Sequence, residues 1–282
     1  MGLALHNFHD THHRFPAALI HSGRYNNPKS QPYCGPEFCY KNEPYVVYNH
    51  TGFVALLPFL EQMPLFQQYD YRQVGSSSSP YGIPIGADTS TNPNRVVSDT
   101  LLKVYTCPSD KDPESVTSSD SKSTGFYERT KARRSNYLFN SGVTTDYDAP
   151  WGQVGGASRG AFGNDGAAGM QSCIDGTSNT LAIGESKQQH TDSAYGPYWG
   201  TGTHTAVHGL GYYINFTPNY PYGLCPGSQL KCQYAWGFGS NHPQTTQFLM
   251  CDGAVRSVPD RINYLTFRYL QTPDGGEVVV EN

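Results

Sequence analysis

The sequence predicts an α+β fold in which an N-terminal helix packs on an antiparallel β-sheet with long loop insertions. Three observations indicate this fold. Residues 51–68 carry apolar side chains at helical spacing, residues 246–258 read as two strands joined by a tight turn, and Gly 30, Pro 20 and Tyr 21 indicate many turns. A chain of 282 residues with 37% hydrophobic residues can also bury a full core.

Charge and hydropathy exclude two classes of protein. The net charge is −4, and no basic run extends beyond residues 131–134. A nucleic-acid-binding protein needs a basic face to neutralise phosphates, so we expect no nucleic-acid partner. No apolar run approaches the roughly 20 residues that span a bilayer, so the printed chain predicts no membrane-spanning helix.

Two helical stretches are expected in the first quarter of the chain. Residues 1–13 read as the tail of a helix, with packing positions at Leu3, Leu5 and Phe8. A proline disfavours helix at the residue before it, so Phe15-Pro16 should end this segment. Residues 51–68 form the second stretch, and Thr51 is its expected N-cap. Pro58 and Pro64 should kink or split this helix. Its apolar face is formed by Phe53, Leu56, Leu57 and Leu60.

Further along, shorter elements are expected. The sequence predicts a short helix at 93–98, extended chain at 103–106, and strands at 135–140 and 180–184. Residues 246–258 predict a hairpin with Asp252-Gly253 as a two-residue turn, which places Met250 opposite Val255, Phe248 opposite Ser257 and Leu249 opposite Arg256. The first strand is largely apolar on both faces, so we expect the hairpin in the middle of the sheet with a helix across it.

The chain has seven cysteines, four of which lie in loops rich in Pro, Gly and Tyr. They predict two local disulfides and an oxidising compartment, with the pairs Cys34–Cys39 and Cys225–Cys232. A zinc site would prefer C-x2-C or paired Cys/His clusters, which the sequence does not show. Cys251 ends an apolar strand and is expected to be a buried thiol. The odd total leaves at least one cysteine free or intermolecular.

Several blocks resemble, in the same order, the DUF1559 family of planctomycetes. They are GLALHNFHDTHHRFP at residues 2–16, LLPFLEQ at 56–62, CPSD at 107–110, SNY at 135–137, DGTSNT with GE at 175–185, His242 with Asp252-Gly253 in an H-x9-DG motif, and PDGG at 273–276. The family comprises pilin-like secreted proteins with no assigned biochemical activity. The expected motif residues are His242, Asp252, Gly253, Asp175, Gly176 and Glu185.

The resemblance implies a pilin-like domain over residues 1–282. Residues 1–14 would be the remnant of a truncated spine helix, and 190–235 a Tyr/Gly-rich insertion. It also implies an extracellular or cell-surface protein that contacts like subunits through the N-terminal helix. The membrane would be reached only through a hydrophobic segment before Met1.

Three patterns in the sequence have the residue types of catalytic or metal-binding motifs. His242 and Asp252 are separated by about 33 Å of extended chain, so we expect His242 to cap or pack at the strand entrance and Asp252 to fill a turn with positive φ. Ser158 lies in G-x-S-x-G, but no apolar strand precedes it as a nucleophile elbow requires. His204 and His208 have helical metal-ligand spacing in a segment that should not form a helix.

Two ligand classes remain open. The resemblance implies that calcium is possible, because related pseudopilins carry a calcium-ordered loop. The oxygen-bearing candidates are Asn164, Asp165 and Asp175, for which ordinary turn roles are the alternative. An aromatic loop could stack on sugars or form a protein interface, through Tyr212, Tyr213, Tyr220, Tyr222 and Trp236.

The leading functional hypothesis is a non-enzymatic pilin- or pseudopilin-like subunit of a filament or of a secretion or adhesion apparatus. An apolar helix that extends beyond its own domain needs neighbouring helices or lipid to cover it. The alternative is an extracellular polysaccharide-binding module that uses the Tyr-rich loops. No coherent nucleophile–base set supports a hydrolase, so we expect no enzyme and no cofactor other than possible calcium.

Overall fold

The computed structural model describes residues 1–20, 47–78, 85–118, 127–146, 148–188, 195–202, 206–211, 217–221 and 237–276. A five-stranded sheet organises these residues, in the order β11-β10-β8-β5-β9. Its strands are β5 (Tyr137–Gly142), β8 (Leu181–Glu185), β9 (His208–Leu210), β10 (Thr245–Met250) and β11 (Val255–Pro259). Only β5 and β9 pair in parallel; the other neighbours are antiparallel. The α+β class is therefore confirmed.

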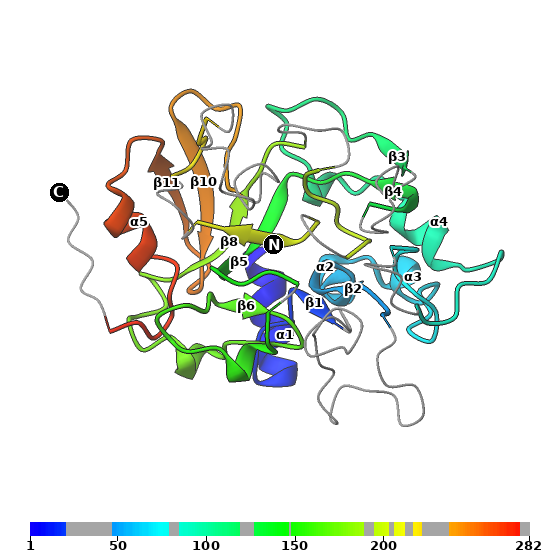
Figure 1. Cartoon of the computed structure of the whole chain (residues 1–282), viewed down its shortest axis with the longest axis horizontal. Helices are drawn as coiled ribbons and strands as arrows, with labels where there is room; N and C mark the ends of the chain where they lie inside the picture. The colour runs from blue at the N-terminus through cyan, green and yellow to red at the C-terminus, as the bar shows by residue number, and fades with distance from the viewer. Residues whose placement is uncertain are drawn as a thin grey trace.

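Short elements surround this sheet (Figure 1). The helices and 3-10 turns are α1 (Gly2–His12), α2 (Gly52–Ala55), η1 (Leu57–Leu60), α3 (Met63–Phe66), α4 (Asn94–Ser98), η3 (Lys103–Tyr105), η4 (Trp151–Gln153), η5 (Met170–Ser172) and α5 (Tyr264–Tyr269). The remaining strands are β1 (Leu19–Ile20), β2 (His50–Thr51), β3 (Ser115–Ser118), β4 (Arg129–Arg133), β6 (Phe162–Gly163) and β7 (Gly166–Ala167). Within the described ranges, no helix has the length and apolar character needed to cross a bilayer.

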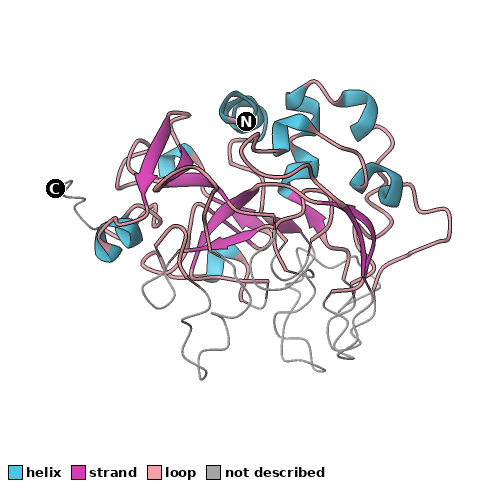
Figure 2. Cartoon of the chain, turned by 90° about the horizontal axis from the view of Figure 1, so that it is seen from above, coloured by secondary structure: helices cyan, strands magenta, loops and turns pink. Residues whose placement is uncertain are grey.

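Helix α1 lies on one side of the sheet (Figure 2) and ends before Phe15-Pro16, as predicted. It buries Ala4, Leu5 and Phe8, whereas Leu3 is 76% exposed, so the prediction that Leu3 packs was wrong. The helical repeat explains the difference, because it places Ala4, Leu5 and Phe8 on one face and turns Leu3 away. The start of the helix approaches β10 closely: a Cβ at Gly2 would lie 3.0 Å from Leu249 Cδ1.

The stretch 51–68 is split into α2, η1 and α3, as its two prolines predict. Thr51 is the N-cap of α2, and its Oγ1 accepts a hydrogen bond of 3.3 Å from the Val54 amide. Phe53 is buried and stacks on Phe139 of β5, with 4.1 Å between the ring centroids. The split helix therefore covers the same face of the sheet as α1. The prediction of extended chain at 103–106 was wrong, because this segment contains the 3-10 turn η3.

The hairpin differs from the prediction by one residue of register. Leu249 pairs with Val255, and Phe248 with Arg256. The loop has three residues rather than two, because the Met250 amide donates to the Ala254 carbonyl at 2.8 Å. The positive φ of 90° falls on Gly253, so the assignment of a positive φ to Asp252 was also wrong. A three-residue loop that ends in a left-handed glycine is a common hairpin connection, and it shifts every cross-strand pair.

The hairpin also lies at one side of the sheet rather than at its centre. β11 is an edge strand with alternating exposure, whereas all five residues of β8 are buried. β8 pairs with β10 on one side and with β5 on the other. The short strand after DGTSNT is therefore the central element.

Both faces of the sheet are covered. Phe139 and Leu249 point into a large cluster with α1 and α2, while their chain neighbours Leu138 and Phe248 point into a second cluster. Alternating side chains reach opposite faces of a strand, which accounts for the two clusters. Helix α5 covers the second face through Phe267, whose ring lies 5.6 Å from that of Phe248. The expectation that the first hairpin strand is covered on both sides is therefore confirmed.

We predict that Leu5→Ala lowers the free energy of unfolding by about 2–5 kcal/mol, because Leu5 is 1% exposed and its loss leaves a cavity. Leu3→Ala on the same helix should change it by no more than about 0.5 kcal/mol. Urea titration of both variants measures the difference. Equal losses would contradict the observed orientation of α1.

Gly253→Ala tests the hairpin loop. An alanine at this left-handed position should lower the free energy of unfolding by about 1–2 kcal/mol. Gly152→Ala is the matched control, since a Cβ there meets no atom within 4 Å. Thermal unfolding that shows the same loss for both variants would argue against the three-residue loop.

Candidate functional site

Three segments that are distant in sequence meet at the end of β8. The first is the loop that carries Cys107 after η3, the second is Glu185 at the end of β8, and the third is His242 in the loop before β10. Their ligand atoms, one from each residue, all lie within 4.8 Å of one another. We refer to these three residues as the Cys–Glu–His cluster.

Two hydrogen bonds that involve Asn136 hold Cys107 at this point. Its amide donates to Asn136 Oδ1 at 3.0 Å, and the Asn136 amide donates to the Tyr105 carbonyl at 2.9 Å. Asn136 directly precedes β5, so the sheet positions the Cys107 loop. Cys107 is only 5% exposed, and burial followed by the nearby Glu185 carboxylate raises the pKa of its thiol. The thiol is therefore the form that this environment favours.

Glu185 is a buried carboxylate, only 4% exposed. Its Oε2 accepts a hydrogen bond of 2.8 Å from the Gln247 amide of β10. Its Oε1 lies 3.3 Å from His242 Nε2. A buried carboxylate needs partners of this kind, because desolvation penalises an unpaired charge.

His242 presents its two ring nitrogens to different partners. Nε2 lies 3.4 Å from Cys107 Sγ and faces Glu185, while Nδ1 lies 3.2 Å from Ser109 Oγ. The backbone is fixed by a hydrogen bond of 3.2 Å from its amide to Ser240 Oγ. His242 lies in the loop before β10, at the entrance of the strand, and its contacts with the cluster were not expected.

Asp110 ties the same segments together from the outside. Its Oδ2 accepts hydrogen bonds from Asn136 Nδ2 at 2.6 Å and from the Gln188 amide at 3.0 Å. Its Oδ1 accepts one from Asn241 Nδ2 at 3.1 Å. Asp110 therefore links the Cys107 loop to the residues before β5, after β8 and beside His242.

With Cys107 as the nucleophile, the cluster does not have the geometry of a nucleophilic triad. In such a triad the nucleophile and the orienting carboxylate occupy opposite nitrogens of the histidine ring. Here Cys107 and Glu185 both face Nε2, and Ser109 occupies Nδ1. Three potential ligand atoms that converge on one point are instead the arrangement that can hold a metal ion.

The other motif residues serve turns. Asp252 Oδ1 accepts the Ala254 amide at 2.9 Å inside the hairpin loop, next to Gly253. Asp175 accepts the Gly275 amide at 2.8 Å, and Gly176 has a positive φ of 98°. The two ends of the H-x9-DG motif therefore have separate partners.

Each of the three calcium candidates has its own local contacts or turn position. The Asn164 amide group donates to the carbonyls of Thr145 and Asp148, and its Oδ1 faces His208 Nε2 at 3.0 Å. Asp165 occupies the turn between β6 and β7 with a φ of 53°. None of these contacts, nor those of Asp175, joins the three candidates, and calcium binding stays a prediction.

Other predicted residues are only partly within the described ranges. His208 lies in β9, which agrees with the prediction that its segment is not helical. Ser158 is preceded by turns and not by the strand that a nucleophile elbow requires. Cys251 is a buried thiol as predicted, and the neighbouring Cys173 thiol, followed by burial, raises its pKa. Tyr220 is partly buried. Outside the described residues lie Cys34, Cys39, Cys225, Cys232, His204, Tyr212, Tyr213, Tyr222 and Trp236.

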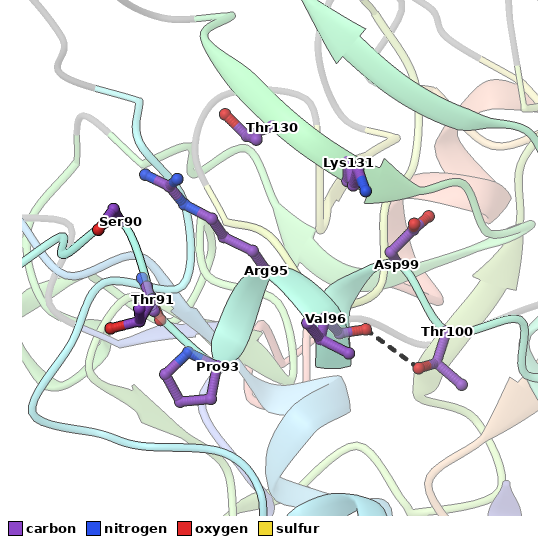
Figure 3. Close-up of a pocket in the computed structure, with 10 residues that line it drawn as sticks. Ser90, Thr91, Pro93, Arg95, Val96, Asp99, Thr100, Thr130 and Lys131 are labelled. Atoms are coloured by element: carbon purple, nitrogen blue, oxygen red, sulfur yellow. Dashed lines mark hydrogen bonds between the residues drawn. The ribbon is translucent and has the colours of Figure 1, made fainter.

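A surface hollow of about 540 Å³ lies elsewhere, between α4 and β4 (Figure 3). Arg95, Asp99 and Lys131 line it, but Arg95 forms an ion pair of 2.8 Å with Asp88, and Asp99 one of 3.0 Å with Arg133. Its charges are therefore largely paired within the domain. The Cys–Glu–His cluster is the stronger candidate for a functional site.

Sequence reasoning placed Glu185 and His242 among the motif residues but missed Cys107 as a site residue. The available signal was the CPSD block, which has a place in the same ordered set as GE and H-x9-DG. The structure brings these blocks together. One residue from each of these three blocks, Cys107, Glu185 and His242, thus contributes to one physical site.

Comparison with known proteins assigns the family. Residues 1–264 match the family described as a protein of unknown function, DUF1559, and the chain therefore belongs to that family. This confirms the membership that the motif blocks predicted. No curated protein and no solved structure matches the chain.

Asp110→Ala is expected to lower the free energy of unfolding by about 1.5–3 kcal/mol, because it removes a charged acceptor from several hydrogen bonds. The neighbouring exposed Asp112→Ala should change it by no more than about 0.5 kcal/mol. Chemical denaturation compares the two. If Asp110→Ala is as mild as its control, Asp110 does not tie these segments together.

Proposed function

We propose that this DUF1559 protein is a pilin- or pseudopilin-like structural subunit at the cell surface, part of a filament or of a secretion or adhesion apparatus. The observation that carries the proposal is that α1 packs on the domain with one side and exposes an apolar side chain on the other. One side buries Ala4, Leu5 and Phe8 in the domain, while Leu3 on its first turn is 76% exposed. The outer side of this turn is therefore accessible to a neighbouring subunit.

A groove beside the start of α1 supports the same proposal. It has a volume of about 280 Å³ and is lined largely by apolar side chains, among them Met1, Leu249 and Val255. Val255 lies on the edge strand β11 and is 67% exposed. An apolar groove at a sheet edge suits a helix from a like subunit, because helices dock through apolar faces.

We also propose that the protein is not an enzyme. Cys107 and Glu185 face the same nitrogen of His242, so Cys107 has no orienting carboxylate on the opposite nitrogen. The raised pKa of the Cys107 thiol disfavours the thiolate that a nucleophile requires. Both features fit a structural role for the cluster.

Leu3→Glu in the full-length protein tests the assembly role. Burying a carboxylate in an apolar subunit contact costs enough to lower the assembled fraction by about tenfold or more. The matched control is Leu265→Glu, since Leu265 is also an exposed leucine on a helix, at 47%. The readout is the fraction of protein that sediments after shearing from cells.

Loss of sedimenting protein with Leu3→Glu alone supports assembly through α1. Wild-type protein that never sediments, or a Leu3→Glu variant that sediments like its control, contradicts it. Circular dichroism spectra of both variants establish that the fold is retained.

A further inference from the structure

We propose that Cys107, Glu185 and His242 bind a divalent transition-metal ion of the zinc type. The ligand atoms are Cys107 Sγ, Glu185 Oε1 and His242 Nε2, which all lie within 4.8 Å of one another. They come from three segments distant in sequence, so the ion would fasten the Cys107 loop and the loop before β10 to the central strand.

The separations match a tetrahedral site. Zinc binds sulfur at about 2.3 Å and nitrogen or oxygen at about 2.0–2.2 Å, so tetrahedral ligand atoms lie about 3.3–3.6 Å apart. The observed separations are 3.4 Å from Sγ to Nε2 and 3.3 Å from Nε2 to Oε1. Two of the three edges of the ligand triangle thus already have the required length.

The ligand types select the metal class. A thiolate and an imidazole are soft and borderline ligands that suit zinc, whereas calcium and magnesium prefer sites made of oxygen atoms alone. A single carboxylate beside a thiolate and an imidazole is compatible with zinc. The donor set therefore argues against the hard cations.

Neighbouring residues hold the three ligands by hydrogen bonds, as the residues around a metal site do. Ser109 Oγ can accept from His242 Nδ1–H, which leaves the Nε2 lone pair for the ion. The Gln247 amide holds Glu185 through Oε2 and leaves Oε1 facing the histidine. Asn136 holds the backbone amide of Cys107. Each ligand is thus oriented by a contact that does not use its coordinating atom.

Charge gives an independent argument. Glu185 Oε1 and Cys107 Sγ both approach His242 Nε2, but a ring nitrogen can donate only one proton. A cation at their common centre would displace the proton of the Cys107 thiol and bind the carboxylate, the resulting thiolate and the imidazole lone pair together. Three protein ligands leave one position of a tetrahedral ion for water, and His242, with 29% of its side chain exposed, lies on the solvent side.

The test is zinc binding to the full chain after removal of metal with a chelator. Competition with a chromogenic chelator should give one site per chain that depends on Cys107, Glu185 and His242. Cys107→Ser, Glu185→Gln and His242→Ala should each weaken that site by at least about tenfold, since even indirect supports of metal ligands contribute that much. Cys173→Ser is the matched control, because Cys173 is also a buried thiol but lies outside the cluster.

The change in Tm on addition of zinc is a second readout. A variant with a fold defect would have a lower Tm with and without zinc, so it would not by itself give the expected result. Zinc should raise the Tm of the wild type and of Cys173→Ser, because a ligand that binds only the native state stabilises it. Glu185→Gln, which retains an oxygen for the Gln247 amide, should lose this zinc-dependent rise. Absence of binding to the wild type, equal binding by the cluster variants, or a loss confined to Cys173→Ser would each overturn the proposal.

Discussion

A carboxylate buried at the end of the central strand constrains the arrangement around it. Glu185 is 4% exposed, and an unpaired charge at such a position would cost several kcal/mol. Its oxygens therefore have to meet the Gln247 amide of β10 and the His242 ring. These contacts fix where the loop before β10 lies relative to β8. Cys107 is held at the same point by Asn136, which directly precedes β5.

Local features of the fold could be predicted from the sequence because their causes are local. Pro58 and Pro64 split the second helical stretch, and Thr51 caps its first turn. The hairpin was predicted to exist, but its register depends on which loop residue takes a positive φ. Asp252-Gly253 is compatible with both a two-residue and a three-residue loop, and only the latter occurs. Strand order depends on tertiary burial, so nothing local marked residues 181–185 as the centre.

The candidate site was less accessible to sequence reasoning. Cys107 and His242 lie 135 residues apart, whereas metal-ligand spacing rules apply to ligands that share one turn or loop. Glu185 and His242 were singled out through the family resemblance, but no spacing linked them to each other or to Cys107. The structure explains why CPSD, GE and H-x9-DG occur in one ordered set. Their chemistry-bearing residues meet at one point, while Asp252 and Gly253 serve the hairpin turn.

Anomalous diffraction at the zinc edge from crystals of the zinc-loaded protein tests the central claim most directly. We expect a peak about 2.0–2.3 Å from Cys107 Sγ, Glu185 Oε1 and His242 Nε2, with His242 Nδ1 still on Ser109. A peak bound elsewhere, with these three side chains left as a hydrogen-bonded group, would contradict the account.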